Sequence, residues 1–124
     1  MKKVYTQEAP AAIGPYSQAV ISGGFVYLSG QIPINPETGT LAGDSIEAQA
    51  EQVCKNIEAV LKVAGSESSK VVKTTCFLRY LSDFEAFNAV YERHFVGKPA
   101  RSCVEVSALP KNALVEIEAV AELS

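Results

Sequence analysis

The sequence is poor in the residues from which many active sites are built. It has no tryptophan, one methionine and one histidine, His94. A single histidine excludes most metal sites made of imidazole ligands. The three cysteines, Cys54, Cys76 and Cys103, are odd in number and have no metal-binding or redox spacing, so we interpret them as reduced thiols of a cytoplasmic protein. We expect no metal and no organic cofactor.

Long apolar runs and an excess of basic charge are missing as well. No apolar stretch approaches the roughly 20 residues of a membrane-spanning helix. Met1, Lys2 and Lys3 are not followed by the apolar segment of a secretion signal. The net charge of −3 and the isoelectric point near 5.2 argue against a general nucleic-acid-binding protein, which normally presents a basic surface. We therefore predict a cytoplasmic protein with no membrane partner.

What the chain does contain suits one folded domain. Apolar residues make up 48% of its 124 residues, which is too many for a disordered chain. A domain of this length buries roughly two-thirds of the surface of its unfolded chain. No linker, internal repeat or low-complexity segment interrupts the sequence. We predict a single domain over residues 1–124.

Hydrophobic periodicity predicts six strands and two helices in the order βββαβαββ. The first helix follows Asp44 or Ser45 as its capping residue and ends at Gly65, and the second follows Ser82 or Asp83. Both helices are amphipathic, so we expect a two-layer α+β domain in which they cover one face of the sheet. The predicted strands cover residues 3–6, 16–22, 25–29, 71–80, 98–106 and 115–119.

Charged side chains follow the period-two alternation of the last two strands. The alternation places Arg101, Cys103 and Glu105 on one face of the first strand, and Glu116 and Glu118 on one face of the second. We predict that this arginine and these carboxylates gather on the sheet face that the helices leave uncovered. The same face carries apolar area from the first strands, so we expect the chain to self-associate.

Several motifs together resemble those of the RidA/YjgF/UK114 family of small trimeric proteins. The likeness runs from about Thr6 to Glu122, in order and with few gaps. Any one segment is weak evidence, but the set is specific. The segments are AIGPYSQA at 12–19, YLSGQIP at 27–33, VVKTT at 71–75, PARSCVEV at 99–106, LPK at 109–111 and EIE at 116–118.

The resemblance implies a chorismate-mutase-like fold with a mixed six-stranded sheet, assembled as a homotrimer with clefts at the subunit boundaries. It also changes one local expectation. The short connection 108–114 alone predicts a hairpin between the last two strands, whereas the resemblance places strand 71–80 between them. The chain departs from the family pattern at 95–98, which is a few residues short, and at Tyr80, where an aspartate is common.

The resemblance implies an activity, the hydrolysis of reactive enamines and imines such as 2-aminoacrylate to 2-keto acids and ammonia. A protein of this kind is a 2-iminobutanoate/2-iminopropanoate deaminase. Arg101 would bind the substrate carboxylate with help from the backbone N–H of Cys103. Glu116 would orient or activate the attacking water. A planar guanidinium suits the carboxylate because it offers two parallel hydrogen bonds.

Four further residues complete the expected site through the resemblance alone. Tyr16 and Ser29 would close the pocket from facing segments, and the Gly30 backbone would lie nearby. Asn88 occupies the position where family members often place an asparagine at the cleft rim. The expected partner is a small 2-imino or 2-keto acid.

Other interpretations remain open at this point. Arg101 could be a structural ion-pair partner of Glu105, Glu116 or Glu118. The protein could also be a regulatory module that binds small carboxylates through Arg101 without turnover. An endoribonuclease, an activity often attached to this family, fits poorly with the acidic charge and the lack of a histidine pair. A nucleophilic Cys103 is disfavoured because no histidine accompanies it.

Overall fold

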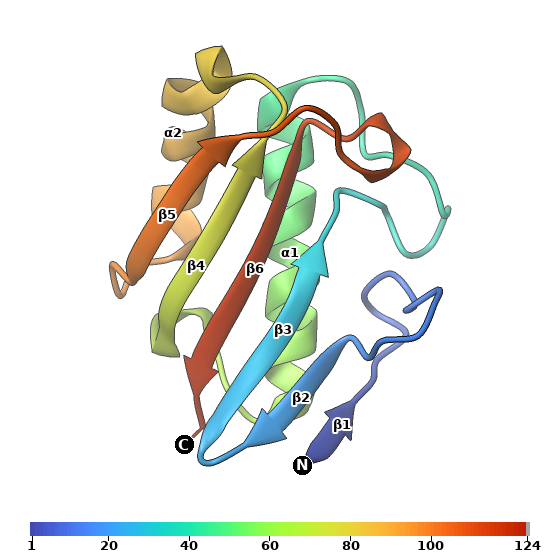
Figure 1. The fold of residues 1–124 in the computed structure, drawn as a ribbon, viewed down its shortest axis with the longest axis vertical. Coiled ribbons are helices and arrows are strands. Elements are labelled where there is room, and N and C mark those ends of the chain that lie inside the picture. Colours follow the sequence, from blue (N-terminus) through green and yellow to red (C-terminus); the bar gives the residue numbers. More distant parts are fainter. Residues whose placement is uncertain (124) are drawn as a thin grey trace.

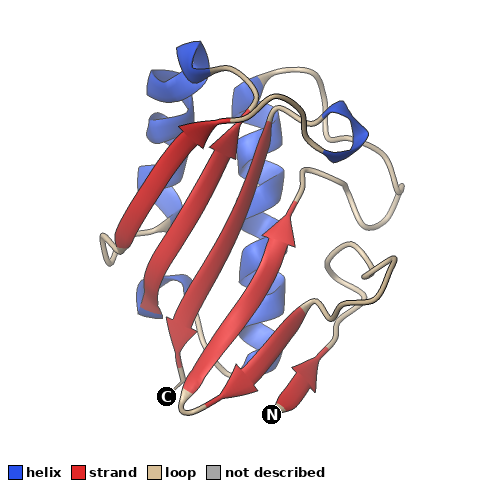
Figure 2. Cartoon of the chain, in the orientation of Figure 1, coloured by secondary structure: helices blue, strands red, loops and turns tan. Residues whose placement is uncertain are grey.

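The computed structural model describes residues 1–123, in which six strands form one sheet and two helices cover one of its faces (Figures 1 and 2). The sheet order is β1-β2-β3-β6-β4-β5, and only the β4–β5 pair is parallel. The predicted α+β two-layer fold is confirmed. The elements are β1 (Lys2–Val4), β2 (Ala19–Ser22), β3 (Phe25–Gln31), α1 (Ile46–Ala64), β4 (Val71–Leu78), α2 (Phe84–His94), β5 (Ala100–Glu105) and β6 (Val115–Glu122).

The order of the last three strands decides between the two expectations for the C-terminal region. β4 pairs with β5 on one side and with β6 on the other. The simple hairpin over 108–114 is therefore wrong, and the placement of the central strand between the C-terminal strands is confirmed. β5 is an edge strand, a position that bears on the site described below.

Helix α1 forms where the sequence pattern places it. The Ser45 hydroxyl accepts the Ala48 N–H at 3.1 Å, which caps the first turn. Gly65 ends the helix with φ 88°, a left-handed conformation that a side chain disfavours. The side chains of Val53, Ile57 and Leu61 repeat at helical spacing and are fully buried against the sheet.

The core lies between the helices and the middle of the sheet. Cys76 and Leu78 of β4, with Val115 and Ile117 of β6, are completely buried there. Burial of each large apolar side chain stabilises the fold by about 1.5–3 kcal/mol. The β4–β6 register shifts between Val71 and Lys73, and Val72 within this shift is only half-buried.

Several strand boundaries also differ from the predictions. β2 begins only at Ala19, because residues 10–18 form a loop. β3 continues to Gln31 through a register shift, and β4 ends at Leu78. Tyr80 lies beyond the end of β4, exposed, with the Arg79 guanidinium 4.6 Å from its ring centre. Within residues 1–123, neither helix has the length and apolar character needed to cross a bilayer.

Candidate active site in two half-sites

Arg101 points to the helix side of the sheet. It lies beside Thr74 in the parallel β4–β5 register, and Thr74 is fully buried beneath the helices. The Arg101 Nη1 donates to the Asn88 Oδ1 of α2 at 2.7 Å. Its guanidinium carbon lies 4.8 Å from the ring centre of Tyr91 and 5.5 Å from that of Phe84. The prediction that Arg101 occupies the uncovered face is wrong.

The physical reason is the position of β5 at the edge of the sheet. Cys103 lies beside the core residue Cys76 and packs against the core, whereas Val104 lies beside Phe77 on the uncovered face and is 44% exposed. The alternation along the strand was predicted with the right period. Its phase was inverted, because at this edge the apolar Val104 faces away from the helices and the charged Arg101 reaches α2.

Among residues 1–123, Arg101 has no acidic partner. The ion pairs among residues 1–123 join Glu51 or Glu58 to Arg93 or His94, and none involves Arg101. The structural ion-pair interpretation of Arg101 is therefore wrong. Its charge is held by a neutral amide and two aromatic rings, which leaves it able to bind an external anion.

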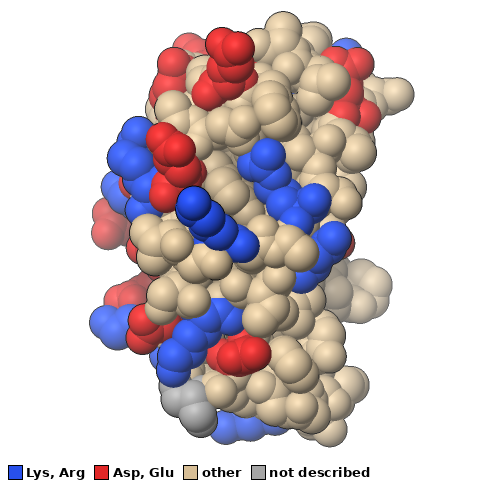
Figure 3. All heavy atoms as spheres, turned by 90° about the vertical axis from the view of Figure 1, so that its left-hand side faces the viewer, with Lys and Arg blue, Asp and Glu red and all other residues tan. Residues whose placement is uncertain are grey.

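A cavity lies beside Arg101. Basic side chains gather across the middle of the side of the molecule where β5 lies (Figure 3). The volume of the cavity is about 510 Å³, and its walls come from α2, the following loop and the start of β5. The lining residues are Asn88, Tyr91, Glu92, Phe95, Val96, Lys98, Pro99 and Arg101.

The backbone of Cys103 complements the guanidinium. The Val106 N–H donates to the Leu78 carbonyl of β4 at 2.9 Å. Because N–H groups point alternately to the two sides of a strand, the Cys103 N–H points to the free edge. Burial raises the pKa of the Cys103 thiol although Arg101 acts in the opposite direction, so the thiol is not a ready nucleophile. We name Arg101, the Cys103 N–H and Asn88 the arginine half-site.

Glu116 lies on the other side of the sheet. It is opposite Phe77 in the β4–β6 register, and the core-facing residues of β6 flank it. Its carboxylate occupies the space beside Gly30: a Cβ atom there would overlap the carboxylate and lie 2.8 Å from its Cδ. Burial, and then the neighbouring Glu118, raise the pKa of Glu116. A raised pKa brings the carboxyl closer to the range of a general base at neutral pH.

Ser29 and Tyr16 belong to the same region as Glu116. The Ser29 hydroxyl donates to the Ser17 carbonyl at 2.6 Å, which ties the strand to the loop that carries Tyr16. Tyr16 is 54% exposed. It lines an apolar cavity of about 500 Å³ between the loops at this end of the sheet. We name Glu116, Gly30, Ser29 and Tyr16 the glutamate half-site.

The two half-sites do not meet within one chain. Arg101 faces the helices and Glu116 faces away from them. β4 lies between their strands, which puts the two backbones about 10 Å apart. One copy of the chain therefore cannot place the Arg101 guanidinium and the Glu116 carboxylate on the same small molecule.

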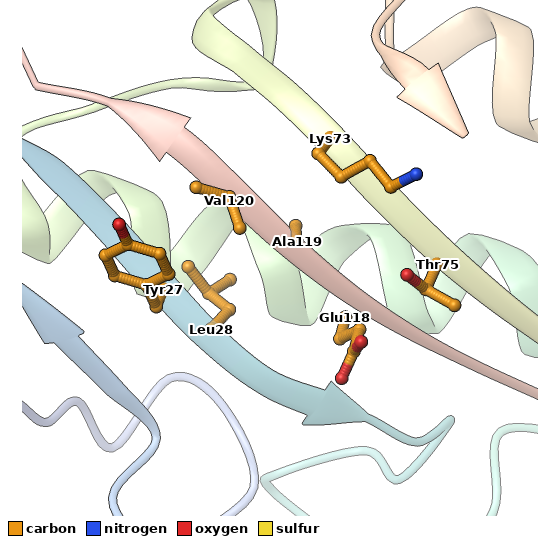
Figure 4. Close-up of a pocket in the computed structure, with 7 residues that line it drawn as sticks. All are labelled: Tyr27, Leu28, Lys73, Thr75, Glu118, Ala119 and Val120. Atoms are coloured by element: carbon orange, nitrogen blue, oxygen red, sulfur yellow. The ribbon is translucent and has the colours of Figure 1, made fainter. Parts of the chain in front are cut away.

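A further hollow lies on the uncovered sheet face, with helix α1 behind the sheet (Figure 4). Its volume is about 240 Å³, and none of the predicted site residues lines it. Within residues 1–123, no three His, Cys, Asp or Glu side chains come together as they would around a metal ion. The residues around the hollow are Tyr27, Leu28, Lys73, Thr75, Glu118, Ala119 and Val120.

The model of one protein family, described as endoribonuclease L-PSP, matches residues 6–123 of this chain. The chain belongs to this family, the RidA/YjgF/UK114 family whose motifs it carries. It is 56% identical to a putative regulator, AldR, of Lactococcus lactis, with 99% of this chain and 98% of that protein covered. It is 49% identical to the 2-iminobutanoate/2-iminopropanoate deaminase of Salmonella typhimurium, with 97% and 96% covered.

A solved structure of the same family matches the whole fold. The crystal structure of E. coli TdcF with bound serine superposes with a TM-score of 0.95 at 41% identity, and all of both chains is covered. This agreement shows that the family fold extends over the entire described chain.

The structure of the present chain also reveals residues beside the site that the sequence analysis missed. Gln18 is 2% exposed, and its amide bonds Thr6 and the Pro10 carbonyl at 2.7–3.0 Å, which fixes the loop before Tyr16. Its place in the motif AIGPYSQA was the available signal. Tyr91, which lies against Arg101, gave none, because the two residues are brought together only by the packing of α2 on β5.

Proposed function

We propose that this protein hydrolyses small 2-imino acids and their enamine tautomers to 2-keto acids and ammonia. The observation that carries the proposal is Arg101, a guanidinium ordered by neutral groups and left without an acidic partner in the described part of the chain. An arginine prepared in this way suits an external carboxylate.

Arg101 orients the substrate. Two N–H groups of the guanidinium and the Cys103 N–H at the free edge of β5 bind the carboxylate. Charge-assisted hydrogen bonds contribute about 1.5–3 kcal/mol each, which is enough to fix a molecule of this size. Asn88 engages Nη1, and no other residue in the described range 1–123 bonds the guanidinium, so its other donors stay free for the ligand.

Glu116 activates the attacking water as a general base. The enamine first takes a proton on carbon and becomes an iminium. Water then attacks its C2 while the Glu116 carboxylate takes a proton from that water. That proton passes to the nitrogen. As the C–N bond breaks and ammonia leaves, the C2 hydroxyl gives its remaining proton to the Glu116 carboxylate and becomes the keto group. Glu116 then returns this proton to solvent, which balances the proton that the enamine took up at the start. General-base assistance of this kind is worth roughly 10²–10⁴-fold.

The active unit is proposed to be a homotrimer, in which the arginine half-site of one copy meets the glutamate half-site of the next. The opposite orientation of Arg101 and Glu116 supports this assembly. The uncovered sheet face supports it too, because it leaves Tyr27 and Val104 nearly half exposed. Among the relatives, the Salmonella protein bears a deaminase name, and the E. coli structure holds serine, a small molecule with a carboxylate.

The test couples a purified threonine dehydratase to this protein and follows the decay of the imine by absorbance. We expect faster decay with the wild-type chain than in buffer, and the loss of that gain in Arg101→Ala. Unchanged decay at micromolar protein overturns the proposal.

The cross-copy site has a test of its own. Arg101→Ala and Glu116→Gln, each inactive alone, are unfolded together and refolded as a mixture. Sites that combine an intact arginine from one variant with an intact glutamate from the other should restore roughly a quarter of the activity, as random mixing within a ring predicts. A mixture as inactive as its components speaks against the shared site.

A binding module without turnover is the second candidate, and the relative named as a putative regulator favours it. Glu116→Gln separates the two functions. For a deaminase, this variant loses hydrolysis and keeps most of its affinity for pyruvate. For a binding module, the wild-type chain binds pyruvate but leaves the rate of imine decay unchanged. An endoribonuclease role gains no support from the single histidine, since His94 is bound to Glu51 and Glu58 of α1.

A further inference from the structure

We propose that Tyr91 is a positioning residue that holds the Arg101 guanidinium in the orientation that receives the substrate carboxylate. This inference rests on the proposed function of Arg101 and deepens it. No motif of the sequence points to Tyr91, but its contacts with Arg101 and with Thr74 indicate this role.

The ring of Tyr91 connects Arg101 to the core. Its face lies 4.8 Å from the guanidinium carbon. Its hydroxyl bonds the Thr74 hydroxyl at 2.7 Å inside the core. Thr74 is the residue beside Arg101 in the β4–β5 register. The ring therefore spans from a buried anchor on one strand to the charged end of the side chain on the next.

The ring has little freedom to move. Tyr91 is only 8% exposed, and Thr74 is fully buried. Phe87 and Phe95 pack against the ring with centroid distances of 5.6 Å and 4.4 Å. A side chain bonded at its hydroxyl and packed by two neighbouring rings keeps one orientation toward the arginine.

Helix α2 arranges the three groups that contact Arg101. Phe84, Asn88 and Tyr91 are spaced by four and then three residues, so they form one stripe on the helix. Asn88 accepts from one end of the guanidinium, while Tyr91 and, at the longer distance of 5.5 Å, Phe84 lie against it. These contacts define the plane and the direction of the group.

Neutral contacts of this kind preserve the binding capacity of the arginine. An aromatic face attracts the guanidinium through its quadrupole without removing its charge. A carboxylate in the same place would compete with the substrate. Because a free arginine side chain loses much rotamer freedom when it binds, fixing it in advance increases the affinity for the ligand.

The experiment measures the binding of pyruvate by isothermal titration and the KM and kcat of imine hydrolysis. Tyr91→Leu keeps an apolar side chain but removes the aromatic face, and we expect the Kd and KM to rise roughly 2- to 30-fold with a smaller change in kcat. Tyr91→Phe keeps the ring face and loses the bond to Thr74, and we expect Kd and KM within about 2-fold of wild type. Thermal unfolding serves as the control, because a merely structural role would make Kd follow stability in both variants.

The outcomes separate this inference from the proposed function. If Arg101→Ala binds pyruvate as wild type does, the proposed function of Arg101 fails. If Arg101→Ala loses binding while Tyr91→Leu, folded, keeps it, the positioning role is overturned and the proposed function stands. If the Tyr91→Leu variant does not fold, NMR of the wild-type chain tests the inference instead. There the Arg101 Nε–H signal, assigned by its loss in Arg101→Lys, must show a ring-current shift, and its absence also overturns the inference.

Discussion

The two half-sites are built in opposite ways. Arg101 is held by what surrounds it: an amide on one side and aromatic rings against its plane. Glu116 instead depends on the absence of a side chain at Gly30, because its carboxylate occupies the space that such a side chain would fill. The contacts of Arg101 fix the guanidinium that binds the ligand. The space beside Gly30 lets the Glu116 carboxylate lie partly buried, and this burial raises its pKa. Substitutions that change one half-site and spare the other test this contrast.

Removal of the guanidinium should give the largest effect. We expect Arg101→Ala to lower kcat/KM by about 10²–10⁴-fold, the loss of two charge-assisted hydrogen bonds. Thermal stability should fall only modestly, through the lost contacts with Asn88 and Tyr91. Arg101→Lys should recover only part of this loss, because an ammonium cannot bind the carboxylate through two parallel bonds. Steady-state kinetics and thermal unfolding check both variants. A lysine variant as active as wild type would show that charge alone is required.

Filling the space at Gly30 should come next. Gly30→Ala places a methyl group against the Glu116 carboxylate and displaces it, so we expect kcat to fall at least 10-fold and pyruvate affinity to change little. The double variant with Glu116→Ala serves as the control. Since the overlap is with the glutamate side chain, adding Gly30→Ala to Glu116→Ala should bring no further loss of stability. A further loss would locate the strain in the backbone of β3.

The pH dependence of Glu116 should separate catalysis from stability. Activity requires the ionised carboxylate, so kcat/KM should decline as the pH falls through a pKa above the ordinary glutamate value. Stability follows the opposite sign. Burial raises the folded-state pKa, so this group's contribution is present at pH below the ordinary value and is lost as the pH rises through the raised one.

A glutamine at position 116 should remove both the pH-dependent activity and the pH-dependent contribution of Glu116 to stability. Glu116→Gln should be inactive and, at neutral pH, more stable by a few tenths of a kcal/mol, because solvent screens a half-exposed carboxylate. Urea unfolding at several pH values measures the difference. A Gln variant less stable than wild type at neutral pH contradicts this account of the raised pKa.

The smallest effect is expected at the junction of the helices. His94 of α2 lies between Glu58, 2.8 Å from its Nδ1, and Glu51, 3.0 Å from its Nε2. Burial lowers the pKa of His94, but the hydrogen bonds of the two carboxylates outweigh it and raise the pKa overall. Its contribution to stability is therefore present below the ordinary histidine pKa and is lost as the pH rises through the raised value.

Substitution of His94 tests whether its contacts with Glu51 and Glu58 stabilise the fold without affecting ligand binding. His94→Gln should lower the free energy of unfolding by less than about 1 kcal/mol at acid pH and by less still at alkaline pH. Pyruvate affinity should stay within about 2-fold, because His94 touches neither half-site. Urea unfolding at the two pH values supplies the comparison. An equal loss at both would assign the contact to packing alone.

The fold was largely predictable from the sequence, and the site only in part. The helical spacing of Val53, Ile57 and Leu61 and the cap at Ser45 are local signals, so α1 was placed within a residue. The strand order was not local, because the short connection 108–114 favours a hairpin that the fold does not form. For Arg101, alternation supplied the period of the strand but not its phase. Only the packing of α2 on an edge strand decides which face is buried.

The opposite orientation of Arg101 and Glu116 also restricts the symmetry of any assembly that unites them. A two-fold dimer would need one surface patch on each copy that includes both residues, so that Arg101 of each copy meets Glu116 of the other. A head-to-tail contact uses two different patches, one at the β5 edge and one on the uncovered face. Such contacts either close into a ring of three or more copies or continue as an open filament, so the proposed homotrimer is the smallest closed assembly that they allow.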